Sequence, residues 1–113
     1  MNELTQKSAG ELAHLIKRKE VSSKEVVEAH LDRIKEVNPE INAITVTLEE
    51  SALEMAAKAD SSNTDIEDKP FHGVPITIKE NIDFVGTPTT NGLPLLAESM
   101  PPRNAPLVDR MLN

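Results

Sequence analysis

Residues 71–92 determine how we interpret the rest of the sequence, and they read Phe-His-Gly-Val-Pro-Ile-Thr-Ile-Lys-Glu-Asn-Ile-Asp-Phe-Val-Gly-Thr-Pro-Thr-Thr-Asn-Gly. Apolar side chains recur there at alternate positions, with a break at Glu80, and they are Val74, Ile76, Ile78, Ile82 and Phe84. The side chains of a β-strand point alternately to its two faces, so this pattern predicts a strand with one buried face.

The opposite face of this predicted strand carries Thr77, Lys79 and Asn81. Glycine and proline residues bound the strand on both sides, as turn-forming residues do. A rigid element would therefore hold the amine of Lys79, which makes this lysine the candidate catalytic residue. A solvent-facing strand lysine without any function is the alternative interpretation of the same pattern.

Composition and charge exclude several classes of function. The chain has 113 residues, which allows one domain at most, and its 19 acidic and 12 basic residues give a net charge of −7. This acidity argues against direct binding to nucleic acid, which requires clustered cations. The absence of cysteine excludes a disulfide framework, a thiolate zinc site and a cysteine nucleophile. No signal-peptide pattern and no long apolar run is present, so we expect a cytoplasmic protein without a membrane partner.

Aromatic residues are scarce, with two phenylalanines and neither tyrosine nor tryptophan. Such side chains usually supply much of the buried area, so an independent core would be thin. The sequence also ends within residues 105–112, which have a helical pattern with no capping glycine after them. These features favour a portion of a longer protein.

Two capping boxes predict the starts of two helices. Ser8 precedes Glu11 by three positions, and Ser22 precedes Glu25 by the same spacing. The second helix is expected to end at Asn38-Pro39, because proline cannot continue the hydrogen-bond ladder.

The remaining elements follow from local composition. Residues 41–48 are β-branched and alternating, which predicts a second strand, and residues 49–60 predict an alanine-rich third helix. Residues 61–69 are polar and turn-forming, and residues 93–104 contain several prolines, so both are expected to be loops.

Other chemistries have little support in the sequence. His14, His30 and His72 are far apart and do not form a metal-binding pair such as His-Glu-x-x-His, so no metal is expected. We interpret His30 as a helix residue and His72 as a turn residue that bonds to the backbone. No serine lies in a Gly-x-Ser-x-Gly elbow, and the glycines do not form a phosphate-binding loop.

Two motifs around the lysine resemble the amino-terminal part of the amidase signature family. They are Gly73-Val-Pro-Ile-Thr-Ile-Lys79-Glu-Asn-Ile-Asp and Gly86-Thr-Pro-Thr-Thr-Asn-Gly92. The segments Asn38-Pro-Glu-Ile-Asn-Ala43 and Asn104-Ala-Pro-Leu-Val-Asp-Arg-Met111 extend the resemblance over nearly the whole chain. This sequence departs from many relatives at Glu80, where aspartate is common, and at Leu93, where serine is common.

The resemblance implies a Ser-Ser-Lys triad in which Lys79 is the lysine. In that family the lysine deprotonates a bridging serine held by a cis peptide, and the bridging serine then activates the nucleophilic serine. The amine must be neutral when it acts, which desolvation or a nearby cation would favour. Both serines belong to a Gly/Ser-rich segment further along the family's chain, so this sequence is expected to hold the lysine alone and to be inactive by itself.

The implied fold is α/β, with amino-terminal helices packed on strands of a mixed sheet, as an incomplete part of the amidase signature fold. Residues 1–113 would be the amino-terminal portion of a single amidase domain. The implied reaction is hydrolysis of a carboxamide, or release of ammonia to an acceptor, without metal or organic cofactor.

The substrate and partners stay open at this point. An aryl amide, a fatty amide, indoleacetamide and the glutamine of a transfer-RNA amidotransferase are all compatible with the motif. Partners would be a small-molecule amide together with further copies of the chain, or the other subunits of an amidotransferase. A noncatalytic binding or scaffold domain that keeps the family shape is the alternative.

Overall fold

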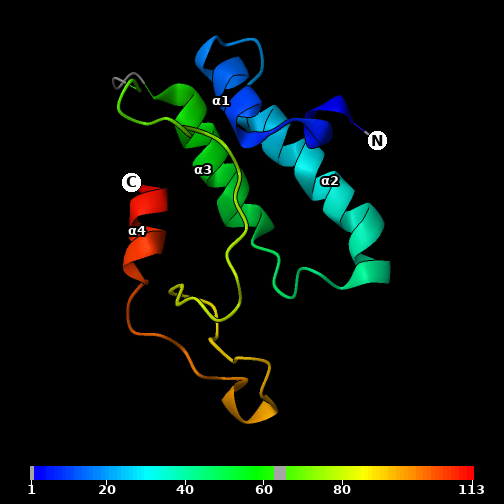
Figure 1. The fold of residues 1–113 in the computed structure, drawn as a ribbon, viewed down its shortest axis with the longest axis vertical. Helices are drawn as coiled ribbons and strands as arrows, with labels where there is room; N and C mark the ends of the chain where they lie inside the picture. Colours follow the sequence, from blue (N-terminus) through cyan, green and yellow to red (C-terminus); the bar gives the residue numbers. More distant parts are fainter. Residues whose placement is uncertain (1, 63–65) are drawn as a thin grey trace. The chain divides into compact units, whose positions relative to one another are not determined.

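The computed structural model describes residues 2–62 and 66–113. The chain divides into two compact units, one that ends at Pro75 and one that comprises Ile76–Asn113. Figure 1 shows the ribbon coloured along the sequence. We describe each unit separately.

The first unit contains a short 3-10 helix and the three longest helices of the described chain. They are η1 (Glu3–Gln6), α1 (Ala9–Lys17), α2 (Ser23–Ile41) and α3 (Glu49–Ser61). Three of these were predicted, and η1 was not.

Both predicted capping boxes are confirmed. The Glu11 backbone N–H donates to Ser8 Oγ at 3.2 Å, and the Ser8 N–H donates back to the Glu11 carboxylate at 2.7 Å. Ser22 and Glu25 repeat this arrangement at 3.1 Å and 2.8 Å. Each box therefore satisfies two backbone N–H groups that helix geometry leaves without a partner.

The carboxyl end of α1 has a left-handed residue that is not glycine. Lys19 has φ +57°, the Lys19 N–H donates to the Ile16 carbonyl, and the Glu20 N–H donates to the Leu15 carbonyl. These bonds define a Schellman motif, in which glycine is the preferred left-handed residue.

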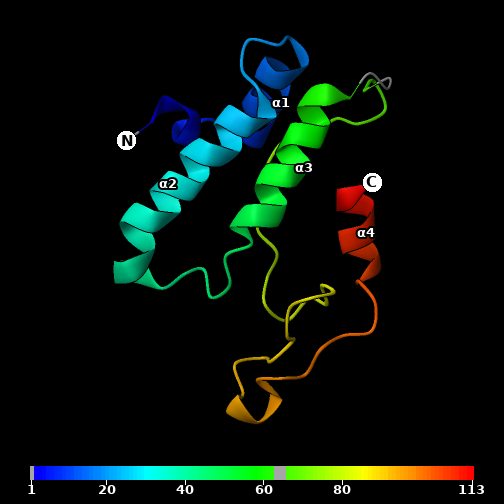
Figure 2. The same ribbon diagram turned by 180° about the vertical axis from the view of Figure 1, so that it is seen from behind.

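Helices α2 and α3 lie side by side in both views of the ribbon (Figures 1 and 2). Val27 and Leu31 of α2 and Ala56 of α3 form one buried apolar cluster. A second cluster joins the other side of α2 to α1, and its buried members are Leu12, Ile16 and Val26. Partly buried Val74 packs on this second cluster, so the core also holds the chain that leads towards Lys79.

The prediction that α2 ends at Asn38-Pro39 is wrong, because the helix continues through Pro39 to Ile41. Pro39 lies in the last turn, so its missing N–H costs the helix one bond, to the carbonyl four residues earlier, close to where the helix ends. Asn42 then ends the helix with φ +45°, and its N–H donates to the Asn38 carbonyl at 2.7 Å.

The predicted mixed sheet is also wrong, since no strand occurs in residues 2–62 or 66–113. In the predicted strand of residues 41–48, the Asn38 side chain bonds both the N–H and the carbonyl of Ile44 at 2.9 Å. A strand would need those groups for pairing with a neighbour. In residues 74–84, the Ile82 N–H donates to the Lys79 carbonyl, which forms a turn. Alternation therefore reports which side chains share a face, but it supplies no pairing partner.

The second unit consists mostly of loops held by side-chain hydrogen bonds. Its helices are η2 (Pro94–Leu96) and α4 (Pro106–Leu112). The predicted helix over residues 105–112 is confirmed, with Pro106 at the first helical position, where its missing N–H costs nothing. The predicted loop of residues 93–104 contains η2, and the predicted loop of residues 61–69 includes residues 63–65, which lie outside the described chain.

Candidate functional site

The chain that leads to the candidate lysine is fixed at Gly73. The side chain of Ser23 is buried at 1% exposure, and its Oγ donates to the Gly73 carbonyl at 2.6 Å. Gly73 has φ +77°, and a Cβ built there would lie 3.0 Å from Ser23 Cβ. Glycine is therefore required here both for its left-handed backbone and for the close approach of α2.

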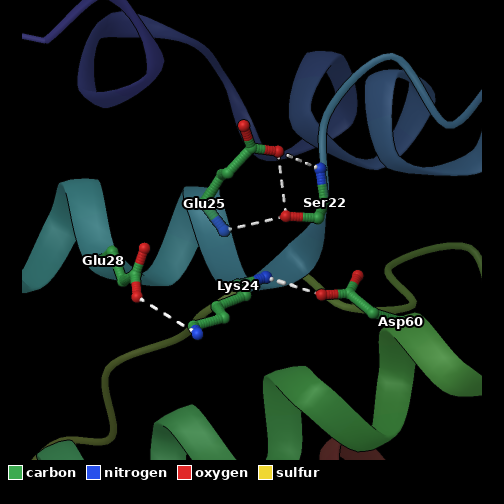
Figure 3. Close-up of polar contacts among 5 residues, drawn as sticks. All are labelled: Ser22, Lys24, Glu25, Glu28 and Asp60. Atoms are coloured by element: carbon green, nitrogen blue, oxygen red, sulfur yellow. Dashed lines mark hydrogen bonds and ion pairs between the residues drawn. The ribbon is translucent and has the colours of Figure 1, made fainter.

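Asp60 at the end of α3 holds the start of α2. Its carboxylate accepts the Ser23 N–H at 2.6 Å and the Lys24 N–H at 3.0 Å. Figure 3 shows Asp60 approaching Lys24 beside the capping box of Ser22 and Glu25. An anion at this position satisfies helix N–H groups and favours the helix dipole. The resulting contact ties α3, α2 and Gly73 together.

Side-chain exposure alternates along the segment that carries Lys79. Odd-numbered positions from Thr77 to Val85 are exposed, and the even-numbered positions between them are half-buried. Thr77, Lys79 and Asn81 therefore share the exposed set, as the sequence predicted, although no strand forms. Ile76, which is 42% exposed, departs from the predicted buried face.

Lys79 lies at the first position of a turn. The Ile82 N–H donates to the Lys79 carbonyl at 3.0 Å. Among the described residues, the lysines that form ion pairs are Lys17, Lys24 and Lys35. The amine of Lys79 is thus exposed and is not committed to a carboxylate in the described chain.

The residue after Lys79 reaches across the loop to Thr90. One oxygen of the half-buried Glu80 carboxylate, Oε1, accepts both the Thr90 backbone N–H and the Thr90 hydroxyl, the latter at 2.6 Å. The Thr90 hydroxyl, and then the Thr90 backbone, lower the pKa of Glu80 below its usual value. The carboxylate of Glu80 therefore favours its ionised form and forms hydrogen bonds with Thr90.

A second pair of side chains repeats this contact. The Asp83 carboxylate accepts the Thr89 hydroxyl at 2.7 Å, and the Thr89 backbone N–H donates to the Ser99 carbonyl at 2.9 Å. The Asp83 carbonyl accepts the Ala105 N–H at 2.9 Å. The loop is thus tied to itself and to the residue that precedes α4.

Sequence reasoning assigned the two threonines to turn chemistry and did not identify their acidic partners. The Asn91-Gly92 step does form a turn, with φ +51° and +73°. The available signal was the match between two acidic residues, Glu80 and Asp83, and the adjacent threonines Thr89 and Thr90, with bonded pairs ten and six residues apart. That signal needs knowledge of the loop closure, which local patterns do not give.

Two of the histidines form hydrogen bonds with backbone carbonyls. His72 Nε2 donates to the Ala59 carbonyl at 3.0 Å, which confirms its interpretation as a turn residue bonded to backbone. His30 Nδ1 donates to the Val26 carbonyl at 2.7 Å within α2. Within the described part of the chain, no group of three or more metal-binding side chains is arranged to hold an ion.

A cavity of about 580 Å³ lies in the first unit, and its lining includes Ser22, Asp60 and His72. Ser22 and Asp60 already bond the start of α2, and His72 bonds the Ala59 carbonyl of α3, so we assign this cavity no chemistry. A membrane-spanning helix is absent from the described residues, because none of the helices there combines sufficient length with sufficient apolarity.

Comparison with known proteins identifies the family. A family model described as Amidase matches residues 25–113, a range that includes Lys79 and the loop that Glu80 and Thr90 join. The chain is 42% identical over 111 residues to a glutamyl-tRNA(Gln) amidotransferase subunit of Caldanaerobacter subterraneus, covering 98% of this chain and 23% of that protein.

Relatives with other named activities match at similar identity over somewhat less of the chain. The chain is 44% identical over 102 residues to "Indoleacetamide hydrolase" of Bradyrhizobium diazoefficiens, covering 89% of this chain and 20% of that protein. It is 46% identical over 100 residues to "Fatty-acid amide hydrolase 2-A" of Danio rerio, covering 81% of this chain and 19% of that protein. The chain thus spans about a fifth of the length of these curated relatives.

Proposed function

Because this chain belongs to the amidase family, we propose that it is the amino-terminal portion of a single amidase domain that hydrolyses a carboxamide, with Lys79 as the general base. The observation that carries the proposal is the position of Lys79. It lies inside the matched range, at the start of a turn that side-chain contacts fix, and its amine forms no ion pair in the described chain.

The proposed reaction uses the amine of Lys79 with two serines from the remainder of the protein. The neutral amine accepts the proton of a bridging serine, which in turn accepts the proton of the nucleophilic serine. The nucleophile attacks the amide carbonyl, the C–N bond breaks, and ammonia leaves with the transferred proton. Water then hydrolyses the acyl-enzyme ester. No metal or organic cofactor takes part in this scheme.

The neutral form of the lysine is essential to this scheme, because an ammonium has no lone pair to accept a proton. Glu80, the carboxylate nearest in sequence, bonds Thr90 and does not pair with the amine in the described chain. A carboxylate beside the amine would favour its charged form.

The substrate class that we propose is a carboxamide that releases ammonia. The relatives are named for indoleacetamide, for fatty-acid amides and for an amidotransferase. In the first two cases water would accept the acyl group and the ammonia would be lost. In the third, the ammonia would pass to an acceptor and the chain would associate with other amidotransferase subunits. A cytoplasmic location stays a prediction from the sequence.

The test measures ammonia release from a panel of amides by the full-length protein and by its Lys79→Ala variant. We expect the variant to lose several orders of magnitude in rate, since triad members act as a unit. Lys58→Ala is the matched control, because Lys58 is also exposed and lies outside the proposed site. The control should retain the rate of the unmodified protein.

The 113-residue chain alone should release no ammonia, because it would lack the nucleophile. Turnover by this chain that Lys79→Ala abolishes would show that the nucleophile is misassigned. The scaffold alternative would be favoured if the full-length protein binds amides but releases no ammonia, either unmodified or as its lysine variants.

A further inference from the structure

The turn that begins at Lys79 has its own fastening, which the proposed chemistry does not use. Glu80 Oε1 accepts the hydroxyl and the backbone N–H of Thr90, and the same hydroxyl accepts the Gly92 N–H at 3.1 Å. Three residues further along, Asp83 accepts the Thr89 hydroxyl at 2.7 Å. Two acidic residues on one side of the loop therefore meet two adjacent threonines on the other.

These contacts enclose the turn of residues 79–82. The Ile82 N–H bonds the Lys79 carbonyl within the turn, while Glu80 and Asp83 fasten it across the loop. Hydrogen bonds from a hydroxyl to a carboxylate are among the stronger neutral-to-ion bonds in proteins. Glu80 and Thr90 are both half-buried, so water competes less for this bond than for one on an open surface.

We propose that Glu80 and Thr90 are positioning residues for Lys79, because their contact fixes the backbone turn from which the lysine amine extends. This inference rests on the proposed function. It assigns a role in the reaction to two residues that do not themselves touch the reacting atoms.

The length and flexibility of the lysine side chain make such fastening necessary. The lysine side chain is a flexible four-carbon stem, so the position of its amine depends strongly on where its backbone is held. A displacement of about 1 Å at a reacting group can lower a rate by roughly a hundredfold.

The acidity of Glu80 is consistent with this role. Its pKa is lowered chiefly by the Thr90 hydroxyl and then by the Thr90 backbone. The Glu80 carboxylate therefore stays ionised near neutral pH and remains a charged acceptor for the Thr90 hydroxyl.

Thr90→Val provides the test, because valine preserves the shape of threonine but removes the hydroxyl. In the full-length protein we expect single-turnover acylation of an amide substrate to slow by about ten- to hundredfold, with little change in KM. Thr90→Ser restores the hydroxyl and should recover most of the lost rate. Thr87→Val is the matched control, since the Thr87 hydroxyl donates at 2.9 Å to the Phe84 carbonyl in the same loop.

The two threonine variants separate positioning from general loop damage. If the hydroxyl of Thr90 acts only by stabilising the loop, Thr87→Val should impair acylation to a similar degree, and that result would overturn the inference. Failure of Thr90→Ser to recover the rate would overturn it as well. A normal rate for Thr87→Val together with a slow Thr90→Val supports it.

Combining Thr90→Val with Lys79→Ala distinguishes failure of the inference from failure of the proposed function. If Thr90 acts through Lys79, the double variant should acylate no more slowly than Lys79→Ala alone. An additional loss of rate in the double variant would contradict action through the lysine. A Lys79→Ala protein with normal acylation would instead refute the proposed function, whatever Thr90→Val does.

Discussion

Replacement of Gly73 by alanine should destabilise the first unit through its contact with α2. Alanine at φ +77° adopts a left-handed backbone, which costs about 1–2 kcal/mol. The added methyl would also lie 3.0 Å from Ser23 Cβ and 3.3 Å from Ile16 Cγ2. Overpacking of this kind costs about 1–3 kcal/mol, so the total expected loss is about 2–5 kcal/mol.

Gly92→Ala is the matched control for the steric part of this loss. Gly92 has a similar φ of +73°, but a Cβ built there meets no atom within 4 Å. The left-handed backbone cost is therefore similar at these two positions, which lie in different units, and only Gly73→Ala adds the close approach to α2.

Urea denaturation of the 113-residue chain, followed by far-ultraviolet circular dichroism, measures both free energies of unfolding. We expect Gly73→Ala to lose about 1–3 kcal/mol more than Gly92→Ala. Equal losses would refute the claim that Gly73 is required by its contact with Ser23.

Three further predictions concern the helix ends, and urea midpoints measure each of them. Asp60→Ala removes the acceptor of two N–H groups at the start of α2 and should cost about 1–3 kcal/mol of stability. The control Glu54→Ala, which like Asp60 lies on α3, should cost far less, and similar losses would contradict the proposed cap. Lys19→Gly should stabilise the chain by about 1 kcal/mol, because glycine removes the left-handed strain at φ +57°. An unchanged or lower urea midpoint would count against the Schellman assignment. The Ser22 backbone and hydroxyl lower the pKa of Glu25 below 4.5, so the contribution of Glu25 to folding stability should be complete above that pH and disappear as the pH falls through the lowered value. Glu25→Gln should therefore lose less stability on acidification than the unmodified chain. Identical pH dependence of the two proteins would exclude this contribution.

The helices were predictable because their signals are local. A serine and a glutamate three positions apart determine a capping box without reference to any other part of the chain, as Ser8 and Ser22 show. The end of α2 was less predictable, since the rule for proline assumes a position within the helix. Pro39 lies in the last turn, where the side chain of Asn38 and the left-handed Asn42 organise the chain instead.

The predicted sheet failed because strand pairing is a property of two segments. The alternation around Lys79 correctly indicated which side chains are exposed, from Thr77 onward. It could not indicate whether a neighbouring backbone is available to pair with this segment. In the described chain, the backbone groups there make turn bonds, as Ile82 does with Lys79.

The sequence motif makes Lys79 the candidate residue, and the matched range includes it, but the motif does not predict the contacts around it. The contact between Glu80 and Thr90 joins residues ten positions apart in an irregular loop, where neither helical nor strand periodicity applies. Only the folded loop shows that the acidic residue beside the lysine is already bonded.

Single-turnover acylation by Lys79→Arg in the full-length protein tests the central claim most directly. Arginine keeps the positive charge but does not release its proton near neutral pH, so it cannot act as a base. If Lys79 is the general base, Lys79→Arg should acylate almost as slowly as Lys79→Ala, several orders of magnitude below the unmodified protein. A lysine that acts only through its charge would tolerate arginine, and near-normal acylation by Lys79→Arg would contradict the assignment.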